Sequence, residues 1–293
     1  MARVSPALET KGLSKSYGKV CALNKVSLQV EPGVTAILGQ NGAGKTTLIK
    51  CALGLENPSK GKIQVFGASP RKRKTRDQVG VMLQDTELPD LLTGRELLDL
   101  FASYYTDPMA ADAVIDLAQV EEFVDKRYRK LSGGQKRRIQ FALAIVGDPD
   151  LVFLDEPTTG LDTEARKVLW NVVRNFANAG RSVVLTTHYL EEADALADRV
   201  VILANGEIVA DGSADDIRKR VGGAVIFCET QLSLERVQSL PGCISATQVG
   251  RLTEIRSSDT VVTLRALLEQ DQHIRDLTIS KPRMEDVFEV LTQ

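Results

Sequence analysis

The segment that decides the fold is VTAILGQNGAGKTTLIKCALGL, which occupies residues 34–55. Its first five residues are all but continuously apolar, as expected of a strand buried on both faces, and residues 47–55 follow a helical pattern. Between them, residues 39–46 fit the pattern G-x-x-x-x-G-K-[ST] in the strand–loop–helix context that this pattern requires. The segment therefore predicts a phosphate-binding loop on an α/β sheet.

The glycines of this loop let the backbone curl so that successive N–H groups point inward, at the positive end of a helix dipole. We expect Lys45 to reach the β- and γ-phosphates of a nucleotide and the Thr46 hydroxyl to ligate Mg²⁺. The alternative is a glycine-rich turn without a ligand. The predicted nucleotide-binding residues are Gly39, Gln40, Asn41, Gly42, Ala43, Gly44, Lys45, Thr46 and Thr47.

A second buried strand, within LVFLDEP at residues 151–157, ends in two adjacent carboxylates. Because successive strand side chains face opposite ways, the two acids are expected to have different tasks. Asp155 suits the coordination shell of Mg²⁺, whereas Glu156 suits polarising a water for attack on the γ-phosphate. The alternative is a pair of solvated acids at the end of a strand.

The segment LSGGQ, residues 131–135, predicts a helix N-terminus, because Ser132 and Gln135 form a capping box for a helix at residues 136–146. Two glycines just inside a cap weaken a helix by about 1 kcal/mol each, so we expect another group to approach this backbone closely. Exposed N–H groups beside a hydroxyl would make a second phosphate receptor.

Strand-like residues 34–38, 151–154 and 183–186 alternate with helical stretches, which predicts parallel strands with crossover helices. A helical insert separates two strands of this sheet. It contains a capping box at Thr93 and Glu96 and a helix at about residues 110–124. Further along, Asn205 and Gly206 predict a tight hairpin.

Near Gly222 and Gly223 the pattern resets to a small α+β domain. Its strands are expected near residues 224–228, 244–249 and 253–256, and its helices near residues 234–240 and 261–270. The predicted domains are therefore residues 1–220, with a helical subdomain at about 88–147, and residues 223–293.

Composition excludes several classes of protein. Lys and Arg number 37 against 39 Asp and Glu, so the chain has a formal charge of −2 and no basic field for nucleic acid, and we read the basic run at residues 71–76 as a solvated loop. No apolar run approaches the roughly 20 residues of a membrane span, and the N-terminus shows no secretion signal. The four cysteines, at positions 21, 51, 228 and 243, are expected to be reduced core residues.

These motifs, in this order, resemble the nucleotide-binding subunit of an ATP-binding cassette transporter over roughly residues 8–220, and LSGGQ is close to diagnostic. The resemblance also includes Gly160-Leu161-Asp162 and Thr187-His188. It implies a P-loop nucleotide hydrolase core with a helical subdomain and an ATPase that uses ATP and Mg²⁺. It further implies two cassettes paired head to tail, expected here as a homodimer. The residues predicted to face the partner's ATP are Ser132, Gly133, Gly134 and Gln135.

Other roles follow only from the resemblance. Tyr17 would stack on adenine, and Gln84, after the strand-like residues 79–83, would touch Mg²⁺ and water and sense a membrane partner. His188 would bond the γ-phosphate and align the water with Glu156, and Asp162 would cap a helix and face the second cassette. The alternatives are a turn or core tyrosine, a strand-end amide and a structural histidine.

The tail, KPRMEDVFEVLTQ at residues 281–293, resembles the Pro-x-x-Glu-Asp-Val-Phe ending of drug- and antibiotic-export cassette subunits, and it also predicts an amphipathic terminal helix. This resemblance implies the motor of an exporter of drugs, antibiotics, lipids or ions. Such a motor works at the cytoplasmic face of the membrane with a separate integral-membrane permease. A soluble cassette ATPase acting on ribosomes or DNA is the alternative, but such proteins usually carry two cassettes or a long coiled coil.

Overall fold

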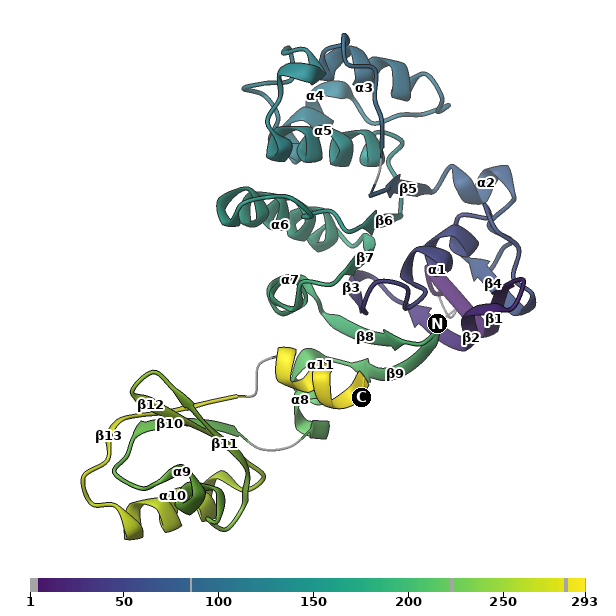
Figure 1. Ribbon diagram of the computed structural model, residues 1–293. Coiled ribbons are helices and arrows are strands. Elements are labelled where there is room, and N and C mark those ends of the chain that lie inside the picture. The colour runs from purple at the N-terminus through teal and green to yellow at the C-terminus, as the bar shows by residue number, and fades with distance from the viewer. Residues whose placement is uncertain (1–4, 85, 222–223, 282–283, 293) are drawn as a thin grey trace. The chain divides into compact units, whose positions relative to one another are not determined.

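The apolar runs at residues 34–38, 79–83, 151–154 and 183–186 become strands of one six-stranded sheet in the computed structural model (Figure 1). The structure describes residues 5–84, 86–221, 224–281 and 284–292. In spatial order the sheet contains β5 (Val79–Met82), β6 (Leu151–Asp155), β7 (Ser182–Thr187), β3 (Gly33–Leu38), β8 (Arg199–Ala204) and β9 (Glu207–Gly212). The first five run parallel, and β9 pairs antiparallel with β8. The carboxyl ends of β3, β6 and β7 therefore meet at one edge, where open α/β sheets bind ligands.

A second sheet of three antiparallel strands has the order β2-β1-β4. Its strands are β1 (Leu8–Tyr17), β2 (Val20–Val30) and β4 (Lys60–Val65). The sequence pattern does not predict it, because repeated register shifts between β1 and its neighbours break the two-residue alternation of a regular strand. One core cluster joins both sheets to α1 (Lys45–Ala52), through residues such as Leu23, Ile49 and Phe153. The helix that follows the phosphate loop is thus packed from two sides.

The prediction that all four cysteines are core residues is wrong at one position. Cys21 lies on β2, an edge strand, and is exposed. Cys51 and Cys228 are buried, and Cys243 is half-buried. All four are free thiols.

Between β5 and β6 the chain forms a helical insert of α3 (Gly94–Ala102), α4 (Ala111–Ala118), a 3₁₀ helix (Tyr128–Lys130) and α5 (Gly133–Ile145), which Figure 1 shows as a group. The capping box of α3 is confirmed, since Thr93 N donates to Glu96 Oε2 at 2.7 Å and Glu96 N donates to Thr93 Oγ1 at 3.2 Å. The helix expected over residues 110–124 is shorter, because Gln119 adopts the left-handed conformation at φ 53° and ends α4.

Outside the helical insert, the chain up to β9 also forms α2 (Arg73–Arg76), α6 (Thr163–Asn178) and α7 (Leu190–Leu196). The basic run at residues 71–76 is therefore a single helical turn for most of its length rather than a loop. Among the described residues, no helix combines the length and the apolar character that a membrane span needs.

The predicted hairpin is confirmed, with Asn205 at φ 50° and Gly206 at φ 80° between β8 and β9. Its turn also contacts the phosphate loop, because Gly206 N donates to Ala43 O at 3.1 Å. A Cβ atom at Gly206 would lie 2.9 Å from Ala22 O. The turn thus lies closely packed beside the loop that precedes α1.

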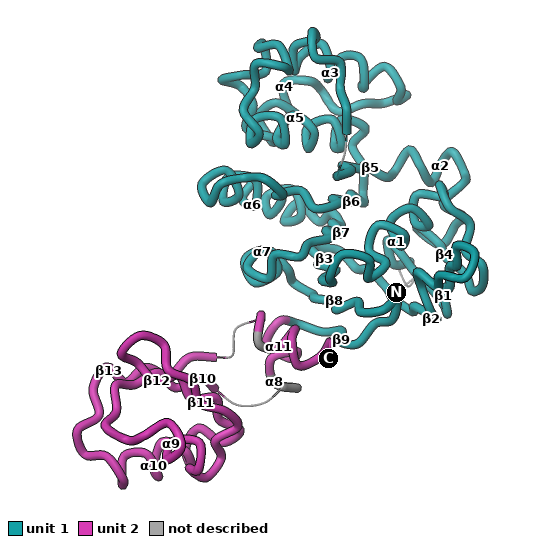
Figure 2. The backbone as a smooth tube through the Cα atoms, in the orientation of Figure 1, with its two compact units in different colours: residues 1–213 teal, residues 214–293 magenta. Residues whose placement is uncertain are grey.

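The chain divides into two compact units, Met1–Ser213 and Ala214–Gln293, coloured separately in Figure 2. The division precedes α8 (Ala214–Val221), which the sequence-based boundary places in the first domain. Gly222 and Gly223, at which we expected the change of pattern, lie outside the described residues.

The second unit contains a four-stranded antiparallel sheet in the order β11 (Cys243–Val249), β12 (Leu252–Ser257), β10 (Ala224–Glu229) and β13 (Arg275–Ser280). Helices α9 (Leu234–Gln238) and α10 (Thr260–Gln270) complete its core with residues such as Val237 and Leu267. The sequence pattern misses β13, an edge strand that is exposed along most of its length. The predicted terminal helix is α11 (Met284–Thr292), which packs on α8, whereas Pro282 and Arg283 of the tail motif lie outside the described residues.

Asp271 ties together two loops of the second unit. Its Oδ2 atom accepts hydrogen bonds from Thr230 Oγ1 at 2.6 Å and Gln231 N at 2.8 Å, and its Oδ1 atom accepts one from His273 N at 2.8 Å. The bond from Thr230, followed by those from the two backbone amides, lowers the pKa of the Asp271 carboxyl. His273 itself is exposed.

We expect Asp271→Ala to lower the free energy of unfolding of the second unit by about 2 kcal/mol at pH 7, because three donors lose a charged acceptor. The folded-state pKa lies below the unfolded one, so this stability is present above the unfolded pKa. It is lost as the pH falls through the aspartate range, near 4. Urea unfolding of the full chain at pH 7 and near pH 4 measures both effects. The exposed Glu269→Ala is the control, and an equal effect of both substitutions at pH 7 would contradict the assignment.

Candidate active site

Lys45 is the first residue of α1 and lies buried at the carboxyl edge of the six-stranded sheet. Its Nζ atom donates to Gly39 O at 2.7 Å and to Gln40 O at 3.2 Å, and lies 3.7 Å from Glu156 Oε1. Burial lowers the pKa of Lys45, while the negative charges of Glu156 and Asp155 oppose this shift. An ammonium group has three protons, so one is left for a further acceptor such as a phosphate oxygen.

Two glycines of the phosphate loop are required by close contacts. A Cβ atom at Gly44, where φ is 107°, would lie 2.4 Å from Ala22 O, and one at Gly39 would lie 2.6 Å from Leu203 O. No side chain caps the N-terminus of α1, whose preceding residue is Gly44. The loop therefore presents backbone N–H groups without a competing side-chain acceptor.

The remaining loop residues differ in exposure. Gln40, Asn41, Gly42 and Thr46 are exposed, Thr47 is half-buried, and Ala43 is buried. The exposed residues are accessible to a ligand from solvent.

Asp155 ends β6 and is held by two hydroxyl groups. Thr46 Oγ1 donates to Asp155 Oδ2 at 3.2 Å, and Thr186 Oγ1 donates to Asp155 Oδ1 at 2.5 Å. A hydroxyl beside a carboxylate fits Mg²⁺, which takes one or two carboxylates and completes its shell with water and phosphate oxygens. Consistent with this donor set, the described residues contain no cluster of three or more His, Cys, Asp or Glu side chains suited to a metal.

Glu156 is the point at which the other predicted catalytic residues converge. Its Oε2 atom accepts hydrogen bonds from Gln84 Nε2 at 3.2 Å and Thr159 Oγ1 at 3.2 Å, and lies 3.3 Å from His188 Nδ1. The side chain is buried, at 7% exposure. The structure thus brings Gln84, Lys45 and His188 together around one carboxylate.

The backbone at Glu156 differs from the expected one. Glu156 has φ 49°, in the left-handed region, and follows the last residue of β6. Strand alternation therefore does not explain why it diverges from Asp155, and that part of the sequence argument is wrong. The two acids still have separate partners, because the left-handed turn redirects Glu156 toward Gln84 and His188. Such backbone strain in a non-glycine residue is typical of functional sites.

Two hydroxyl residues of this site were missed in the sequence. Thr186 binds Asp155 and also accepts a hydrogen bond from Glu156 N at 3.2 Å, while Thr159 binds the Glu156 carboxylate. The available signal was that Thr186 lies near the end of a predicted buried strand and directly precedes Thr187 and His188. Threonine is common in strands because it is β-branched, so no sequence pattern distinguishes a functional threonine there from one that only packs in the strand.

Other predicted residues lie apart from this cluster. Ser132 caps α5 as expected, since its Oγ atom accepts from Gln135 N at 3.3 Å and Ser132 N donates to Gln135 Oε1 at 3.0 Å. In Figure 1 helix α5 lies well away from α1 within the first unit. Asp162 caps α6 by accepting from Ala165 N at 2.8 Å.

The two glycines of the Ser132 segment have different surroundings. A Cβ atom at Gly134 would lie 2.9 Å from Ala165 Cβ, so packing of α5 against α6 requires a glycine there. A Cβ atom at Gly133 would meet only Leu161, at an ordinary 3.8 Å. The expectation that an outside group explains both glycines is therefore wrong for Gly134.

Tyr17 ends β1 and is 43% exposed, so its ring is available for stacking. Lys15 Nζ lies 4.8 Å from the centre of the ring, and also donates to Glu56 Oε2 at 2.7 Å. This lysine orients the ring by a cation–π contact.

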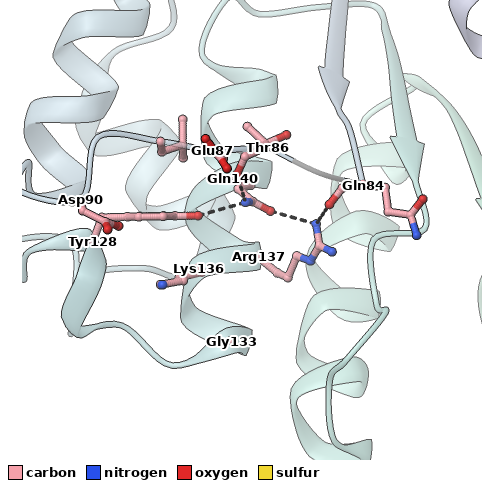
Figure 3. A pocket seen from close by; sticks show the side chains of 10 residues that line it. Gln84, Thr86, Glu87, Asp90, Tyr128, Gly133, Lys136, Arg137 and Gln140 are labelled. Carbon is pink, nitrogen blue, oxygen red and sulfur yellow. Dashed lines mark hydrogen bonds between the residues drawn. The ribbon is translucent and has the colours of Figure 1, made fainter.

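A pocket of about 730 Å³ lies on the side of Gln84 that faces the helical insert (Figure 3). Gln140 Nε2 donates to Tyr128 Oη at 2.9 Å, and Arg137 Nη1 donates to Gln140 Oε1 at 3.0 Å and to Gln84 O at 3.2 Å. The pocket and the Glu156 carboxylate are therefore connected through Gln84. Asp85, the next residue, lies outside the described residues.

Comparisons with known proteins show the family of the chain. The family described as ABC transporter matches residues 23–159. A daunorubicin resistance ATP-binding protein of Streptomyces coeruleorubidus is 34% identical over 302 residues, covering 98% of this chain and 96% of the relative. A Nod factor export ATP-binding protein of Rhizobium etli is 34% identical over 295 residues, covering 98% of this chain and 93% of the relative.

Solved structures are similar to the chain over about three quarters of its length. The ATP-binding subunit of an ABC transporter superposes with a TM-score of 0.66 at 31% identity, covering 73% of this chain and 93% of the other. A dimeric bacterial ABC transporter cassette superposes with a TM-score of 0.63 at 25% identity, covering 70% and 98% of the two chains.

Thr186 generates a prediction about metal dependence. We expect Thr186→Val to raise the Mg²⁺ concentration needed for half-maximal ATP hydrolysis by about tenfold, because Asp155 loses a hydrogen bond that orients it. Thr186→Ser keeps the hydroxyl and is the matched control. A titration of steady-state hydrolysis with Mg²⁺ at saturating ATP measures the shift, and identical curves for the two variants would exclude a role for the hydroxyl.

Proposed function

This chain belongs to the ABC transporter family, and from that premise we propose that it is the ATP-hydrolysing motor subunit of an exporter. Two relatives that span nearly the whole chain are named for daunorubicin resistance and for Nod factor export. The observation that carries the catalytic assignment is the convergence of Gln84, His188 and Lys45 on the buried carboxylate of Glu156. The relatives give no support to a soluble ATPase that acts on ribosomes or DNA.

Binding of ATP is assigned to the phosphate loop and α1. The backbone N–H groups of residues 39–47 and the Nζ proton of Lys45 would donate to phosphate oxygens. Thr46 and Asp155 supply the oxygen ligands that fit Mg²⁺, and the ion, when bound, neutralises charge on the β- and γ-phosphates. Gln84 donates a hydrogen bond to Glu156 through its Nε2 atom. It is the third proposed metal contact. Tyr17 would stack on adenine with its exposed ring.

Hydrolysis needs a group that accepts a proton from the attacking water, and Glu156 is the proposed base. Gln84, Thr159 and His188 surround its Oε2 atom and hold the carboxylate in one orientation. Lys45 Nζ lies 3.7 Å from the other oxygen, Oε1, so both oxygens of the carboxylate have a neighbour. His188 therefore acts by positioning, with its ring stacked on Tyr189 at 4.2 Å between centroids.

The second half of the catalytic site is proposed to come from another cassette. Ser132, Gly133 and Gln135 lie on α5, apart from the Lys45 cluster of the same chain, yet Ser132 and Gly133 are exposed. A capped helix N-terminus with exposed N–H groups suits the γ-phosphate of ATP held by a partner. Support comes from the structural similarity to a dimeric bacterial cassette. We propose a head-to-tail homodimer, with Asp162 near the contact.

A permease is the second proposed partner, acting at the cytoplasmic face of the membrane. Gln84 lines the pocket shown in Figure 3, and its side-chain Nε2 atom donates to Glu156 Oε2. We assign to this pocket the contact through which the permease influences hydrolysis. The second unit, residues 214–293, is proposed to stabilise or regulate the pair of cassettes, since the phosphate-site motifs all precede it.

Glu156→Gln tests the catalytic base. It should leave the Kd for ATP within about threefold and lower kcat at least about a hundredfold, because an amide cannot accept the proton. Calorimetric titration with ATP and a steady-state phosphate assay on the full chain measure the two quantities. Glu269→Gln, an exposed acid in the second unit, is the control. Hydrolysis by Glu156→Gln at the wild-type rate would refute the assignment.

Mixing two inactive variants tests the shared site. Lys45→Ala and Ser132→Arg chains, combined as a heterodimer, place both lesions in one composite site and leave the other intact. Activity should recover to about half that of wild type if one intact site turns over. Differently tagged chains, purified through both tags, ensure that heterodimers are assayed. No recovery in a purified heterodimer would count against the head-to-tail arrangement.

A further inference from the structure

Glu192 is a fully buried carboxylic acid that the proposed chemistry does not use. It lies on α7, four residues after His188, with 0% exposure. Its Oε1 atom accepts a hydrogen bond from Trp170 Nε1 of α6 at 3.1 Å, whereas within the described part of the chain its Oε2 atom has no hydrogen-bond partner. Burying an acid with so few partners is costly, and an apolar side chain of similar size would usually be as stable there. Glu192 therefore calls for a reason other than stability.

The polar neighbours of Glu192 belong to the two segments that hold the catalytic carboxylate. Thr158 and Thr187 both lie close enough to influence its ionisation. Thr158 directly precedes Thr159, which donates to Glu156, and Thr187 directly precedes His188. The Thr158 hydroxyl is buried and, among the described residues, also has no hydrogen-bond partner. Glu192 and Thr158 thus each have a buried polar atom without a hydrogen-bond partner among the described residues, and Thr158 influences the Glu192 carboxyl.

A second path leads from α6 to His188 itself. The guanidinium carbon of Arg166 lies 5.3 Å from the centre of the Tyr189 ring, and this ring contacts the His188 ring in a tilted arrangement, with 4.2 Å between centroids. Arg166 also pairs with Glu191 of α7 at 3.9 Å and interacts electrostatically with Glu192. Arg166 of α6 and Tyr189, which precedes α7, therefore support the His188 ring through successive contacts.

We propose that Glu192 is a positioning residue for ATP hydrolysis. It links Trp170 of α6 to the segments that carry Thr159 and His188, so that both reach Glu156 in the productive geometry. Glu192 does not touch Glu156 and takes no part in proton transfer. The proposal rests on the function proposed above. It adds a buried residue that supports Thr159 and His188, two of the residues that surround the Glu156 carboxylate.

The protonation behaviour of Glu192 guides the choice of variants. Burial raises the pKa of the Glu192 carboxyl, and the contacts with Thr187, Trp170 and Thr158 partly oppose this shift. In either protonation state the carboxyl offers an acceptor oxygen to Trp170 Nε1, and a glutamine keeps such an acceptor at nearly the same size. Glu192→Gln should therefore preserve the positioning, whereas Glu192→Leu keeps the volume and removes every polar contact.

The experiment compares variants of the purified full chain by kcat and KM for ATP. Glu192→Leu should lower kcat about tenfold or more and leave KM within about threefold, because misplaced catalytic groups slow the chemical step more than they weaken binding. Trp170→Phe, which removes the N–H donor, should lower kcat in the same direction. Glu192→Gln should stay within about threefold of wild type. A kcat of Glu192→Leu equal to that of wild type, or a loss in Glu192→Gln as large as in Glu192→Leu, would overturn the proposal.

A control variant separates positioning from loss of stability. Val172 is fully buried on α6, and Val172→Ala should lower the stability of the protein by removing core packing on the same helix without touching the polar contacts. Urea unfolding ranks the variants by stability. If Val172→Ala lowers kcat as much as Glu192→Leu does, the effect follows stability and the proposal fails.

Trp170 supplies a readout that does not depend on turnover, because it is the one tryptophan of the sequence. If Glu192 transmits movement of the His188 segment, ATP binding should change Trp170 emission in wild type and in Glu192→Gln. The change should be lost in Glu192→Leu at a saturation that calorimetry confirms. A wild-type chain that binds but does not hydrolyse ATP would contradict the proposed function, and the emission change would then still decide the role of Glu192. An emission change that persists in Glu192→Leu would overturn the proposed positioning role of Glu192.

Discussion

The two hydrogen bonds that Asp155 accepts join the three segments from which the catalytic edge is built. Thr46 belongs to α1 and follows β3, Asp155 ends β6, and Thr186 lies opposite Asp155 in the register of β6 and β7. A buried carboxylate is costly without such partners, so this contact makes strand register and loop position depend on each other. Shifting β7 by one residue would turn the Thr186 hydroxyl to the other face of the sheet. The positions of the phosphate loop, the proposed metal ligands and the start of the His188 segment therefore depend on one carboxylate.

Glu156 shows how a site can depart from regular structure where regular structure ends. Its left-handed backbone comes directly after a fully buried strand, and the peptide N–H at this position is still held by Thr186. The hydrogen bonds from Gln84 and Thr159 help to offset the local strain. The same carboxylate connects to the helical insert through Gln84, Arg137 and Gln140, which form a continuous set of contacts between the pocket and the proposed base.

Local rules made a large part of this structure predictable. The strand–loop–helix pattern located the phosphate loop, a turn dipeptide located the β8–β9 hairpin, and capping residues located the starts of α3 and α5, because each feature depends on a few neighbouring side chains. The failures have non-local causes. Register shifts hide β1 from any periodic pattern, Gly134 is required by Ala165 on another helix, and Thr186 acquires its role only once β6 and β7 are paired. The backbone conformation of Glu156 could likewise not be predicted from the sequence, since no sequence rule places a glutamate in the left-handed region.

The turn at Gly206 gives the phosphate loop a property that concerns entropy rather than contacts with a ligand. Gly206 N binds the carbonyl of Ala43, Asn24 N binds the carbonyl of Gly206, and Ala22 O blocks any side chain at Gly44. A glycine-rich loop left free would lose much conformational freedom at the moment it closed around a phosphate. Here the contacts at Ala43 and Gly44 already restrict that part of the loop when the protein folds. Nucleotide binding then costs little further ordering of the loop, so a larger share of the interaction free energy appears as affinity.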